Sequence, residues 1–568
     1  MGSVPLAEGV GHTARPLADR VTVWTLRAGA VALPLAVWPA GYDAFVLPKL
    51  AVLHLLVLAL LGLRVGAWVG TGRLRGARTS LDLPLAALVV SAAISTALAV
   101  NVNLALFGAY YRYEGLITIV SYALLFRLSA QALDRDAAWS VARALLLGGY
   151  LASLLAVAQS LVGGAMVAGS AAETARTFGG ALRASSTFGN AAALSAFLAM
   201  LLPLAVHELL RARSASERII GANVAVVLGL ALALTYSRAA WLGAALGVAV
   251  VAGPAIVRTR RAALLAAGGA AAIVGGLVAL AAAHALPAWA AAVLSRVATL
   301  ADPTEGSGAS RLHIWHDTLA LVAARPWVGW GPDTFGLVYQ RFQTGDWTPG
   351  FLIDKAHSDL LQVAATQGLL GVAAYVGLLA AVIVAWWRGR ASAGAAALLG
   401  AWLAYALPLQ VEFSWLPAAA PAWLLLAVAV VVWGRDAPGR AAEVAPARAP
   451  NVRRLALGTG AAAALAALLA ASAALPLAAD ARFRDALLAS ARGDRPGALA
   501  AIEDARRLAP EQGVYAANAG DLLLDLGPDD RPGPAAEPAA ARPAYLDALR
   551  LGDARPEVAA RLDLTRGR

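Results

Sequence analysis

The sequence predicts an all-α, polytopic membrane protein, and two observations support that prediction. Of its 568 residues, 60% are hydrophobic and 14% are charged, which is more apolar than an ordinary soluble domain. The apolar residues also gather into long runs, and about 20 of them suffice for a helix to cross a bilayer. We therefore expect about 12–13 transmembrane helices. We also expect a long extracytoplasmic loop at 286–357 and a helical-repeat tail at 479–568.

About thirteen segments have the length and hydropathy of a spanning helix. They lie near residues 22–39, 45–63, 81–99, 115–133, 139–163, 188–208, 218–235, 238–257, 263–285, 358–387, 393–409, 415–434 and 455–478. Two pairs of these segments, within 218–257 and 393–434, are separated by very short connections. For each pair, the alternative to two spanning helices is a re-entrant element. Residues 1–20 contain no short apolar core before a cleavage site, so the first span is expected to act as its own targeting signal.

The arginines indicate the side of the membrane on which each connection lies. They crowd alternate connections: Arg64, Arg73, Arg75 and Arg78; Arg127 and Arg135; Arg211, Arg213 and Arg218; Arg258, Arg260 and Arg261; Arg388 and Arg390; Arg435, Arg440, Arg448, Arg453 and Arg454. Short cytoplasmic loops retain such residues during insertion, so these connections are predicted to lie inside. The outward-facing parts are then residues 100–114, 164–187, 236–238, 286–357 and the tail after 478.

A few basic residues remain on the predicted outer side, although basic residues normally stay in the cytoplasmic loops. They are Arg112, Arg176, Arg183, Arg238, Arg311 and Lys355. Membrane sorting accounts for most of the net charge of +11, and no nucleic-acid partner is expected. The chain contains no cysteine, which excludes disulfides, thiolate nucleophiles and cysteine-ligated zinc. The outward basic residues therefore need a different explanation.

His357 is the leading candidate for proton transfer. It stands where the long loop meets the next apolar run, so we expect it in the first turn of that helix. The unpaired N–H groups and the dipole of a helix N-terminus disfavour imidazolium. A neutral ring there can accept a proton from a hydroxyl as a general base. The alternative is a histidine that only caps the helix or binds the loop backbone.

Arg238 and Arg311 are candidates for binding an anionic group. Arg238 follows Tyr236 in a very short outer turn, at headgroup depth, where an unpaired arginine is costly. Phosphate matches its planar fork of donors, whereas the alternatives are an internal carboxylate such as Glu114 or Asp359, or snorkelling to lipid phosphates. Arg311 and Trp315 are one helical turn apart, and Trp315 is expected to be an interfacial anchor.

Further candidates lie on the same predicted side. Arg112 is flanked by tyrosines that either belong to the aromatic belt or stack on sugar rings. Arg183 and Asn190 add basic and amide groups. His313 and His316 could share a helical face as metal ligands, but no third ligand has a diagnostic spacing, so no metal or other cofactor is expected.

The tail after residue 478 changes from membrane-like to charged, helix-patterned sequence. Segments 486–494, 498–505 and 515–527, with Pro510 between them, resemble a tetratricopeptide helix pair. Repeats of this kind need neighbours to bury their faces. We expect the tail to pack on the membrane domain or to bind a protein partner.

Several motifs, in order along the chain, resemble the bacterial O-antigen ligase and polymerase superfamily. The matching pieces are Gly108 to Gly115, Thr187 to Asn190, Thr235 to Gly243, Arg311 and Trp315 through Gly331 to Phe335, and His357-Ser358 through Gly368 and Gly371. They cover much of residues 100–375. Their order and spacing are typical of the superfamily but not of one activity within it.

The resemblance implies a metal-independent glycosyltransferase in residues 1–478, placed in the bacterial cytoplasmic (inner) membrane, and an inverting displacement is expected. Such an enzyme takes a glycan from an undecaprenyl diphosphate carrier and joins it to a hydroxyl of a lipid or protein acceptor at the extracytoplasmic, periplasmic face, in cell envelope and lipopolysaccharide biogenesis.

The resemblance also implies roles for individual residues. The histidine matching His357 activates the acceptor, and the arginines matching Arg238 and Arg311 bind the diphosphate. The expected substrate-binding residues are Arg112, Arg183, Asn190, Tyr236 and Trp315. Thr366 departs from the family pattern, because related sequences often carry a glutamate soon after the histidine. Asp359 and Glu114 are the alternatives for a carboxylate role.

Other functions remain open. A lipid-linked glycan polymerase or a protein O-oligosaccharyltransferase differs only in its acceptor, for which the sequence has no code. A transporter of lipid-linked glycan should carry charges deep in several spans. The spans hold few such residues, apart from Arg27, Lys49 and His54, which favours the enzyme.

Overall fold

Helices make up almost all of the described chain. The computed structural model describes residues 17–72, 78–162, 177–178, 181–258, 287–298, 307–344, 352–392, 394–434, 452–526, 531–553 and 555–565. Within these ranges the only strands are β1 (Thr177–Phe178) and β2 (Ala181–Leu182), a short antiparallel pair. The predicted all-α class is therefore confirmed.

Within the described residues, seven helices are long and apolar enough to cross a membrane. They are α2 (Val46–Thr71), α6 (Arg135–Val162), α8 (Ala191–Arg211), α9 (Ala215–Ala233), α15 (Asp359–Gly389), α17 (Leu416–Trp433) and the continuous run Val452–Ala491. Other helices cover further predicted spans: α1 (Leu17–Leu35), α3 (Asp82–Ala97), α5 (Leu116–Ala132), α10 (Arg238–Arg258) and α16 (Ala395–Ala406). The predicted span 263–285 lies outside the described residues. The chain is a multi-pass membrane protein, and the count of 12–13 spans stays a prediction.

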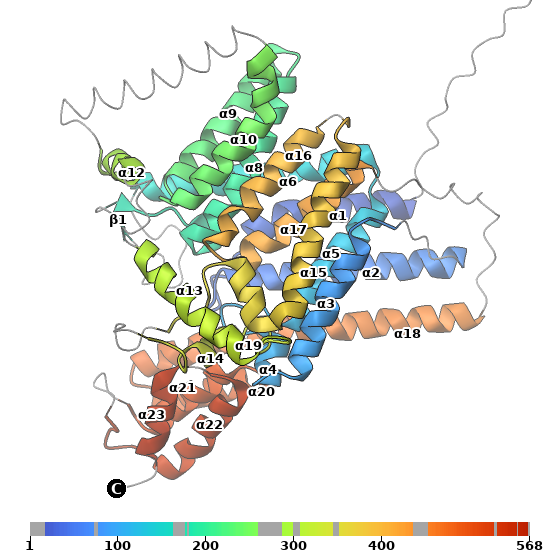
Figure 1. Ribbon diagram of the computed structural model, residues 1–568. Coiled ribbons are helices and arrows are strands. Elements are labelled where there is room, and N and C mark those ends of the chain that lie inside the picture. Colours follow the sequence, from blue (N-terminus) through green and yellow to red (C-terminus); the bar gives the residue numbers. More distant parts are fainter. Residues whose placement is uncertain are drawn as a thin grey trace, which may run out of the picture.

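Helix α17 lies at the centre of the bundle (Figure 1). Nearly all of its residues are buried, and it contacts α1, α2, α5, α6, α8, α15 and α16. The helix has no charged residue, so its burial leaves no ion to solvate. This packing fixes the position of the loop that precedes Leu416.

Helix α15 is interrupted one-third of the way along its length. Gly368 has φ +66° and ψ −165°, outside the helical region. The break frees two amides, which find partners in the loop between α13 (Ser307–Ala324) and α14 (Phe335–Tyr339). Leu369 N–H donates to the Pro326 carbonyl (2.7 Å), and Leu370 N–H donates to the Trp327 carbonyl (3.3 Å). Loop 326–331 therefore replaces part of the helix's own hydrogen bonding.

The carbonyls released by the break are also satisfied. Trp330 N–H donates to the Ala365 carbonyl (3.0 Å), and Gly331 N–H donates to the Thr366 carbonyl (2.9 Å). The Ser95 hydroxyl of α3 donates to the same Thr366 oxygen. Unpaired backbone N–H and C=O groups inside a membrane protein raise its free energy. These hydrogen bonds therefore hold the loop against the helix.

The remaining elements lie mostly at one end of the bundle. They are α4 (Val102–Phe107), η1 (Ser186–Phe188), α12 (Ala288–Ala298), α13 (Ser307–Ala324), α14 (Phe335–Tyr339), η2 (Pro408–Gln410), and the tail helices α20 (Arg495–Leu508), α21 (Gly513–Leu523), α22 (Pro538–Leu551) and α23 (Pro556–Leu564). In Figure 1 the tail helices lie below α4, α13 and α14. The tail is thus a helical unit, whereas its tetratricopeptide identity stays a prediction.

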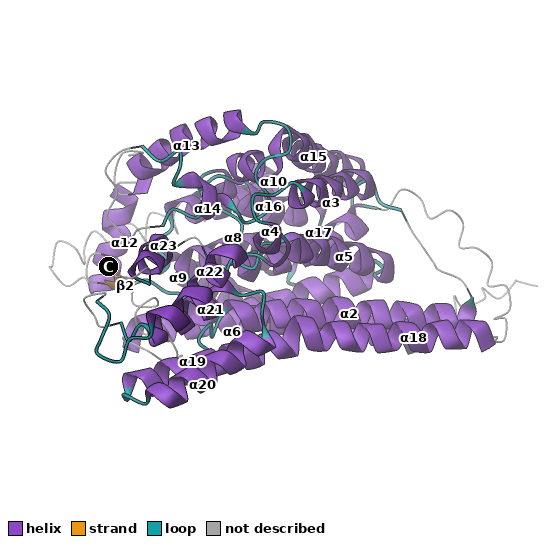
Figure 2. Cartoon of the chain, turned by 90° about the horizontal axis from the view of Figure 1, so that it is seen from below, coloured by secondary structure: helices purple, strands orange, loops and turns teal. Residues whose placement is uncertain are grey.

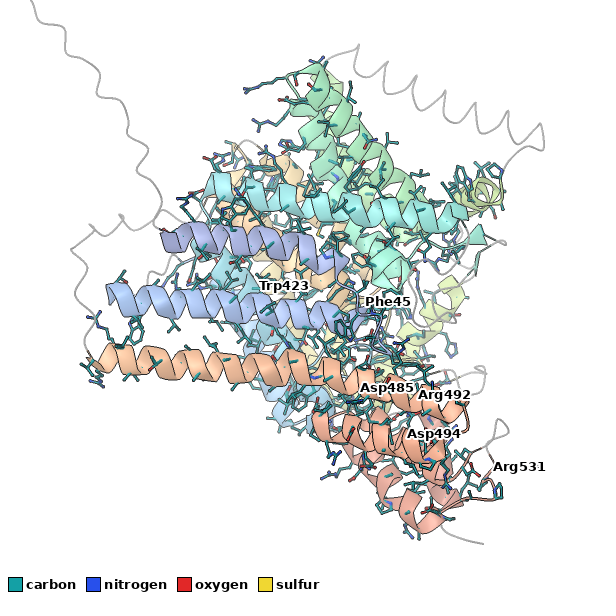
Figure 3. All side chains as sticks on the ribbon, turned by 180° about the vertical axis from the view of Figure 1, so that it is seen from behind. Phe45, Trp423, Asp485, Arg492, Asp494 and Arg531 are labelled. Atoms are coloured by element: carbon teal, nitrogen blue, oxygen red, sulfur yellow. The ribbon has the colours of Figure 1, made fainter. Side chains whose placement is uncertain are left out.

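A single long helix joins the tail to the membrane domain. It comprises α18 (Val452–Leu469), a π-helical turn η3 (Ala470–Ala474) and α19 (Leu475–Ala491). The helix runs beside α2 (Figure 2), and His54 Nδ1 of α2 lies 2.9 Å from the Ser472 carbonyl in the π turn. Figure 3 shows Phe45 at the start of α2 and Asp485 on α19, the last part of the long helix that joins the tail to the membrane domain. The predicted domain boundary at 478 therefore falls inside a helix.

The tail packs on the loop between α4 and α5. Asp480 of α19 accepts hydrogen bonds from the Tyr110 hydroxyl and from the Asp43 amide (2.9 Å). The Asn103 side-chain amide donates to the Glu511 carbonyl (2.9 Å). Phe483 packs edge-on against Tyr110, with ring centroids 6.1 Å apart. These contacts bind the tail to the segment that carries Arg112.

The opposite end of the bundle carries the arginine-rich connections. Arg127 at the end of α5 pairs with Asp82 at the start of α3 (3.3 Å), and Arg143 of α6 pairs with Glu208 near the end of α8 (3.3 Å). Among the described residues, these two pairs lie at the end of the bundle away from the tail, which agrees with the alternation of arginines in the sequence. Which end faces the cytoplasm stays a prediction.

Replacing Gly368 by alanine should destabilise the protein. An added Cβ would overlap the Trp327 backbone, and φ +66° strains any residue other than glycine, at a cost of about 1–3 kcal/mol from the backbone alone. We expect the thermal unfolding midpoint of the purified protein in detergent to fall by several degrees. The matched control is Gly377→Ala in the same helix, where the nearest atom lies 3.9 Å from the added Cβ. Equal midpoints for the two variants would contradict this account of the break.

Candidate active site

Three loops and one helix meet at the tail end of the bundle. The loops are residues 108–115 before α5, 352–358 before α15 and 411–415 before α17, and the helix is α13. His357, Arg112, Arg311 and Trp315 belong to this meeting point, so four of the predicted site residues are brought together. The contacts below define the group.

His357 precedes α15 rather than lying in its first turn. Ser358 is the N-cap, and its hydroxyl accepts the Leu361 N–H, so the helix begins at Asp359. His357 itself has φ +50°, which turns the chain sharply before the cap. The prediction of a first-turn histidine was wrong because the serine, with its short side-chain acceptor, takes the capping position.

The imidazole of His357 lies against aromatic rings. Its centroid is 5.2 Å from that of Phe413, edge to face. Trp315 Nε1 of α13 donates to the His357 carbonyl (3.3 Å), which ties the turn to α13. The Nδ1 atom is buried and has no hydrogen-bond partner among the described residues. The ring therefore offers an unused nitrogen within the site.

The pKa of His357 is lowered to about 4, first by burial and then by the charges of Arg311 and Arg112, against the opposing effect of Asp354. The ring is thus neutral at ordinary pH. Neutrality was predicted from a helix dipole, whereas the structure attributes it first to desolvation and then to neighbouring cations. A neutral, buried imidazole can act as a base toward a hydroxyl.

Arg112 is held by a carboxylate and two rings. Its guanidinium pairs with Asp354, in the loop before α15, through Nε (2.7 Å) and Nη2. The same group lies 5.0 Å from the ring centroid of Phe413 and 5.4 Å from that of Trp415. Burial raises the pKa of the Asp354 carboxyl, but the charge and hydrogen bond of Arg112, together with nearby Lys355 and His357, outweigh burial and hold the pKa below its usual value. The pair is therefore ionised.

Arg311 is held by a residue that sequence inspection did not single out. Its Nη2 lies 2.5 Å from Oε1 of Glu412, in the loop before α17, and both side chains are about 20% exposed. Arg311 Nε is buried without a partner among the described residues. The arginine thus keeps at least one N–H donor for a ligand while Glu412 orients it.

Lys355 forms a buried pair behind the site. Its Nζ lies 2.9 Å from Oδ1 of Asp333, and both side chains are under 5% exposed. The other oxygen of Asp333 accepts the amides of Ala109 (2.8 Å) and Glu114 (3.2 Å). Lys355 and Asp333 therefore hold the loops that carry His357 and Arg112 against each other.

Glu114 is a further carboxyl group that interacts electrostatically with this buried pair. Burial raises its pKa to about 7, against the lowering effect of Lys355. The Tyr122 hydroxyl donates to it (3.1 Å). Glu114 and Asp359 were the alternatives for the glutamate that Thr366 lacks. Asp359 accepts the Ser414 N–H (2.8 Å). The Thr366 hydroxyl donates to the Gln362 carbonyl of its own helix (2.7 Å).

Three of the basic residues on the predicted outer side, which break the positive-inside rule, have carboxylate partners in the structure. Arg112, Arg311 and Lys355 each pair with a carboxylate supplied by another segment of the chain. Arg183 instead donates from Nε to the Thr235 carbonyl (3.0 Å). Arg176 lies outside the described residues. The site is therefore close to electrically balanced before a ligand arrives.

A second group of predicted residues surrounds the start of α10. Tyr236 is almost fully buried with φ +54°, and Arg296 of α12 donates to its carbonyl (3.3 Å). Arg183 reaches the adjacent Thr235, and Arg238 is the first residue of α10 and is partly buried. The contacts described for this group do not join it to His357, so a shared site remains a prediction.

Asn190 has a structural task. It is the N-cap of α8, and its Oδ1 accepts the amides of Ala192 (2.8 Å) and Ala193 (3.2 Å). Its carbonyl oxygen is therefore engaged by the helix, which leaves only the NH2 group for the predicted substrate contact.

The two histidines of α13 flank an aspartate. His313 Nε2 lies 3.5 Å and His316 Nδ1 3.2 Å from Asp317 oxygens. Asp317 also accepts the Tyr339 hydroxyl (3.0 Å) and the Thr344 amide (3.0 Å). Asp317 thus stabilises the fold of the loop after α14, and the ring of His316 is mostly exposed.

Sequence inspection missed four residues of the site: Asp354, Glu412, Phe413 and Trp415. One signal was available, because Glu412 is the only acidic residue between the apolar runs of α16 and α17. Its partner, however, is 101 positions away, and nothing local indicates it.

Fold and site together define a multi-pass membrane protein with a polar, arginine- and histidine-bearing site at one end of its helical bundle. Residues 223–376 match the family model described as O-Antigen ligase. The match covers only this part of the chain, and it supports the resemblance to the O-antigen ligase superfamily that the sequence predicted. The matched residues include Arg238, Arg311, Trp315 and His357. No curated protein matches the chain. Arg112, Arg183, Asn190 and the tail lie outside the matched residues.

The lowered pKa of His357 predicts a pH dependence of stability. Between pH 6.5 and about 4 the histidine is protonated in the unfolded chain but neutral in the folded one, so the unfolded state binds more protons and stability falls as pH falls. The loss amounts to about 2 kcal/mol at pH 4.5. We expect His357→Gln to lose less stability than the parent protein between pH 7.5 and 4.5, measured by thermal unfolding. The control is His316→Gln, whose side chain is 78% exposed; identical pH profiles for parent and His357→Gln would refute the neutral, buried imidazole.

Proposed function

We propose that this protein is a glycan transferase that moves a glycan from undecaprenyl diphosphate to an acceptor hydroxyl. The observation that carries the proposal is a neutral, buried imidazole flanked by two arginines, within residues that include an O-antigen ligase match. The general class, a membrane glycosyltransferase of the ligase or polymerase type, follows from the family. The donor, acceptor and chemistry are the proposal.

The chemistry follows from the charges around His357. Its ring nitrogen accepts the proton of the acceptor hydroxyl, whose oxygen forms a bond to the anomeric carbon of the glycan. The bond between that carbon and the phosphate oxygen breaks, and the electron pair leaves with the carrier diphosphate. Attack from the face opposite the leaving group inverts the anomeric centre. Arginine N–H groups stabilise the charge that grows on the diphosphate.

Arg311 suits the diphosphate better than Arg112 does. Its Nε is buried and unpaired among the described residues, whereas Arg112 uses Nε and Nη2 on Asp354. Arg112 also lies between Phe413 and Trp415, whose ring faces can stack on sugars. We propose Arg311, with Arg238, at the diphosphate and Arg112 with its aromatic neighbours at the glycan.

The proposed location is a bacterial inner membrane with the site at the periplasmic face. The arginine-rich connections lie at the end opposite His357, which is the arrangement that the positive-inside rule produces for an outward site. The tail lies beside the site and offers a surface for a lipid or protein partner. A polymerase or a protein O-oligosaccharyltransferase would use the same chemistry with a different acceptor.

Removing the imidazole should abolish transfer. With purified protein, undecaprenyl diphosphate-linked glycan and candidate acceptors, His357→Ala should lower the release of carrier diphosphate by at least about 100-fold, the usual contribution of a general base. Donor binding should be largely kept, because no donor contact is assigned to the imidazole. His316→Ala on the adjacent helix is the control. Transfer that survives His357→Ala would remove this residue from the mechanism, and mass analysis of the product identifies the acceptor.

Arg311 can be tested apart from its structural pair. Arg311→Ala leaves Glu412 partly buried and unpaired, which destabilises the fold and confuses any loss of activity. The double variant Arg311→Ala/Glu412→Ala removes both charges and should recover most of the unfolding midpoint. We expect it to remain impaired, with the donor KM raised or kcat lowered by roughly tenfold or more. If the double variant regains full activity, Arg311 serves only the fold.

A further inference from the structure

Apart from the site at His357, the protein has a polar cavity at the arginine-rich end of the bundle. It has a volume of about 990 Å³ and opens between α6, α8 and α9. These helices lie side by side in Figure 1. Its basic lining residues are Arg135, Arg143, Arg211 and Arg213. Neither the proposed transfer nor the family match assigns it a role.

The cavity has more cationic groups available than carboxylates to neutralise them. Glu217 is occupied at the start of α9, where it accepts the Arg213 amide (2.7 Å) and, as part of a capping box, the Ser214 amide (3.4 Å). Glu208 pairs with Arg143 (3.3 Å). No salt bridge joins the guanidinium groups of Arg211 and Arg213 to a carboxylate within the described residues, although Glu217 lies near Arg213. Asp136, in the first turn of α6, is the third acidic group of the lining.

The cavity becomes apolar away from its arginines. On α6, Leu147 follows Arg143 by one turn, and on α9, Ile220 follows Glu217 by almost one turn. Leu147 is 51% exposed and Ile220 is 64% exposed, so both present apolar surface at the cavity. The Tyr150 hydroxyl is satisfied by Asn223 (2.7 Å), which leaves the ring as a further apolar wall. The lining thus changes from basic to apolar along the helix axes.

We infer that this cavity binds an anionic phospholipid. Its phosphate would lie at the Arg211 and Arg213 end, and an acyl chain would run along Leu147 and Ile220. Guanidinium groups match phosphate oxygens, and basic pockets between transmembrane helices are typical sites for anionic headgroups. A free phosphate would leave the apolar wall uncovered, and a zwitterionic lipid would leave the surplus positive charge unbalanced. The lipid bridges α6, α8 and α9.

The inference can be tested on the full-length protein after delipidation in detergent. Dioleoyl phosphatidylglycerol should raise the thermal unfolding midpoint in a saturable way and should be retained in native mass spectra. Dioleoyl phosphatidylcholine tests the need for net negative charge, and glycerol 3-phosphate tests the need for acyl chains. Both should have little effect at the same concentration.

Matched variants separate the site from the general charge of the protein. Arg211→Gln/Arg213→Gln should weaken phosphatidylglycerol binding by roughly tenfold or more, whereas Arg388→Gln, at the same end but outside the cavity, should not. Leu147→Trp should block the acyl path, whereas Leu151→Trp, one turn farther on α6 and not part of the lining, should not. The substituted arginines are exposed, so the midpoint without lipid should be unchanged and reports on folding separately.

Three results would overturn the inference. The first is equal protection by phosphatidylcholine, which would make the site a nonspecific lipid contact. The second is equal protection by glycerol 3-phosphate, which would make it an anion site. The third is undiminished phosphatidylglycerol binding in the double arginine variant or in Leu147→Trp.

Discussion

The exchange of backbone hydrogen bonds at the break in α15 is the constraint on which the site depends. Gly368 leaves the helical conformation, and the amides and carbonyls thereby released pair with loop 326–331. The loop follows α13, which carries Arg311, and the helix follows His357. The base and the arginine are therefore positioned by main-chain geometry as well as by their side chains. Glycines are required because the two backbones approach more closely than any Cβ permits.

Charge balance explains how the cationic residues can be carried on the predicted outer side of a membrane protein. Each of Arg112, Arg311 and Lys355 has a carboxylate partner from another segment. Such pairs compensate for desolvation and hold the loops together. They also leave His357 near cations that keep its ring neutral. The same pairs therefore serve both folding and the proposed chemistry.

The tail belongs to the architecture of the site. Asp480, on the helix that leads into the tail, accepts the Tyr110 hydroxyl and the Asp43 amide, and Tyr110 is two residues before Arg112. Movement of the tail would thus be transmitted to the loop that carries this arginine. A ligand that binds the tail would lie at the same end of the bundle as the loop that carries Arg112.

The sequence by itself determined the helical class, the positions of the apolar spans, the segregation of arginines to one end, and the family motifs around Arg311 and His357. These properties are local, because hydropathy over about 20 residues depends only on neighbours in the chain. Tertiary structure alone decided the break at Gly368, the N-cap at Ser358 in place of His357, and the carboxylate partner of each cation. Arg112 and Asp354 are 242 positions apart, and Arg311 and Glu412 are 101 apart. Such pairings arise only when packing brings distant helices together, and no local pattern encodes them.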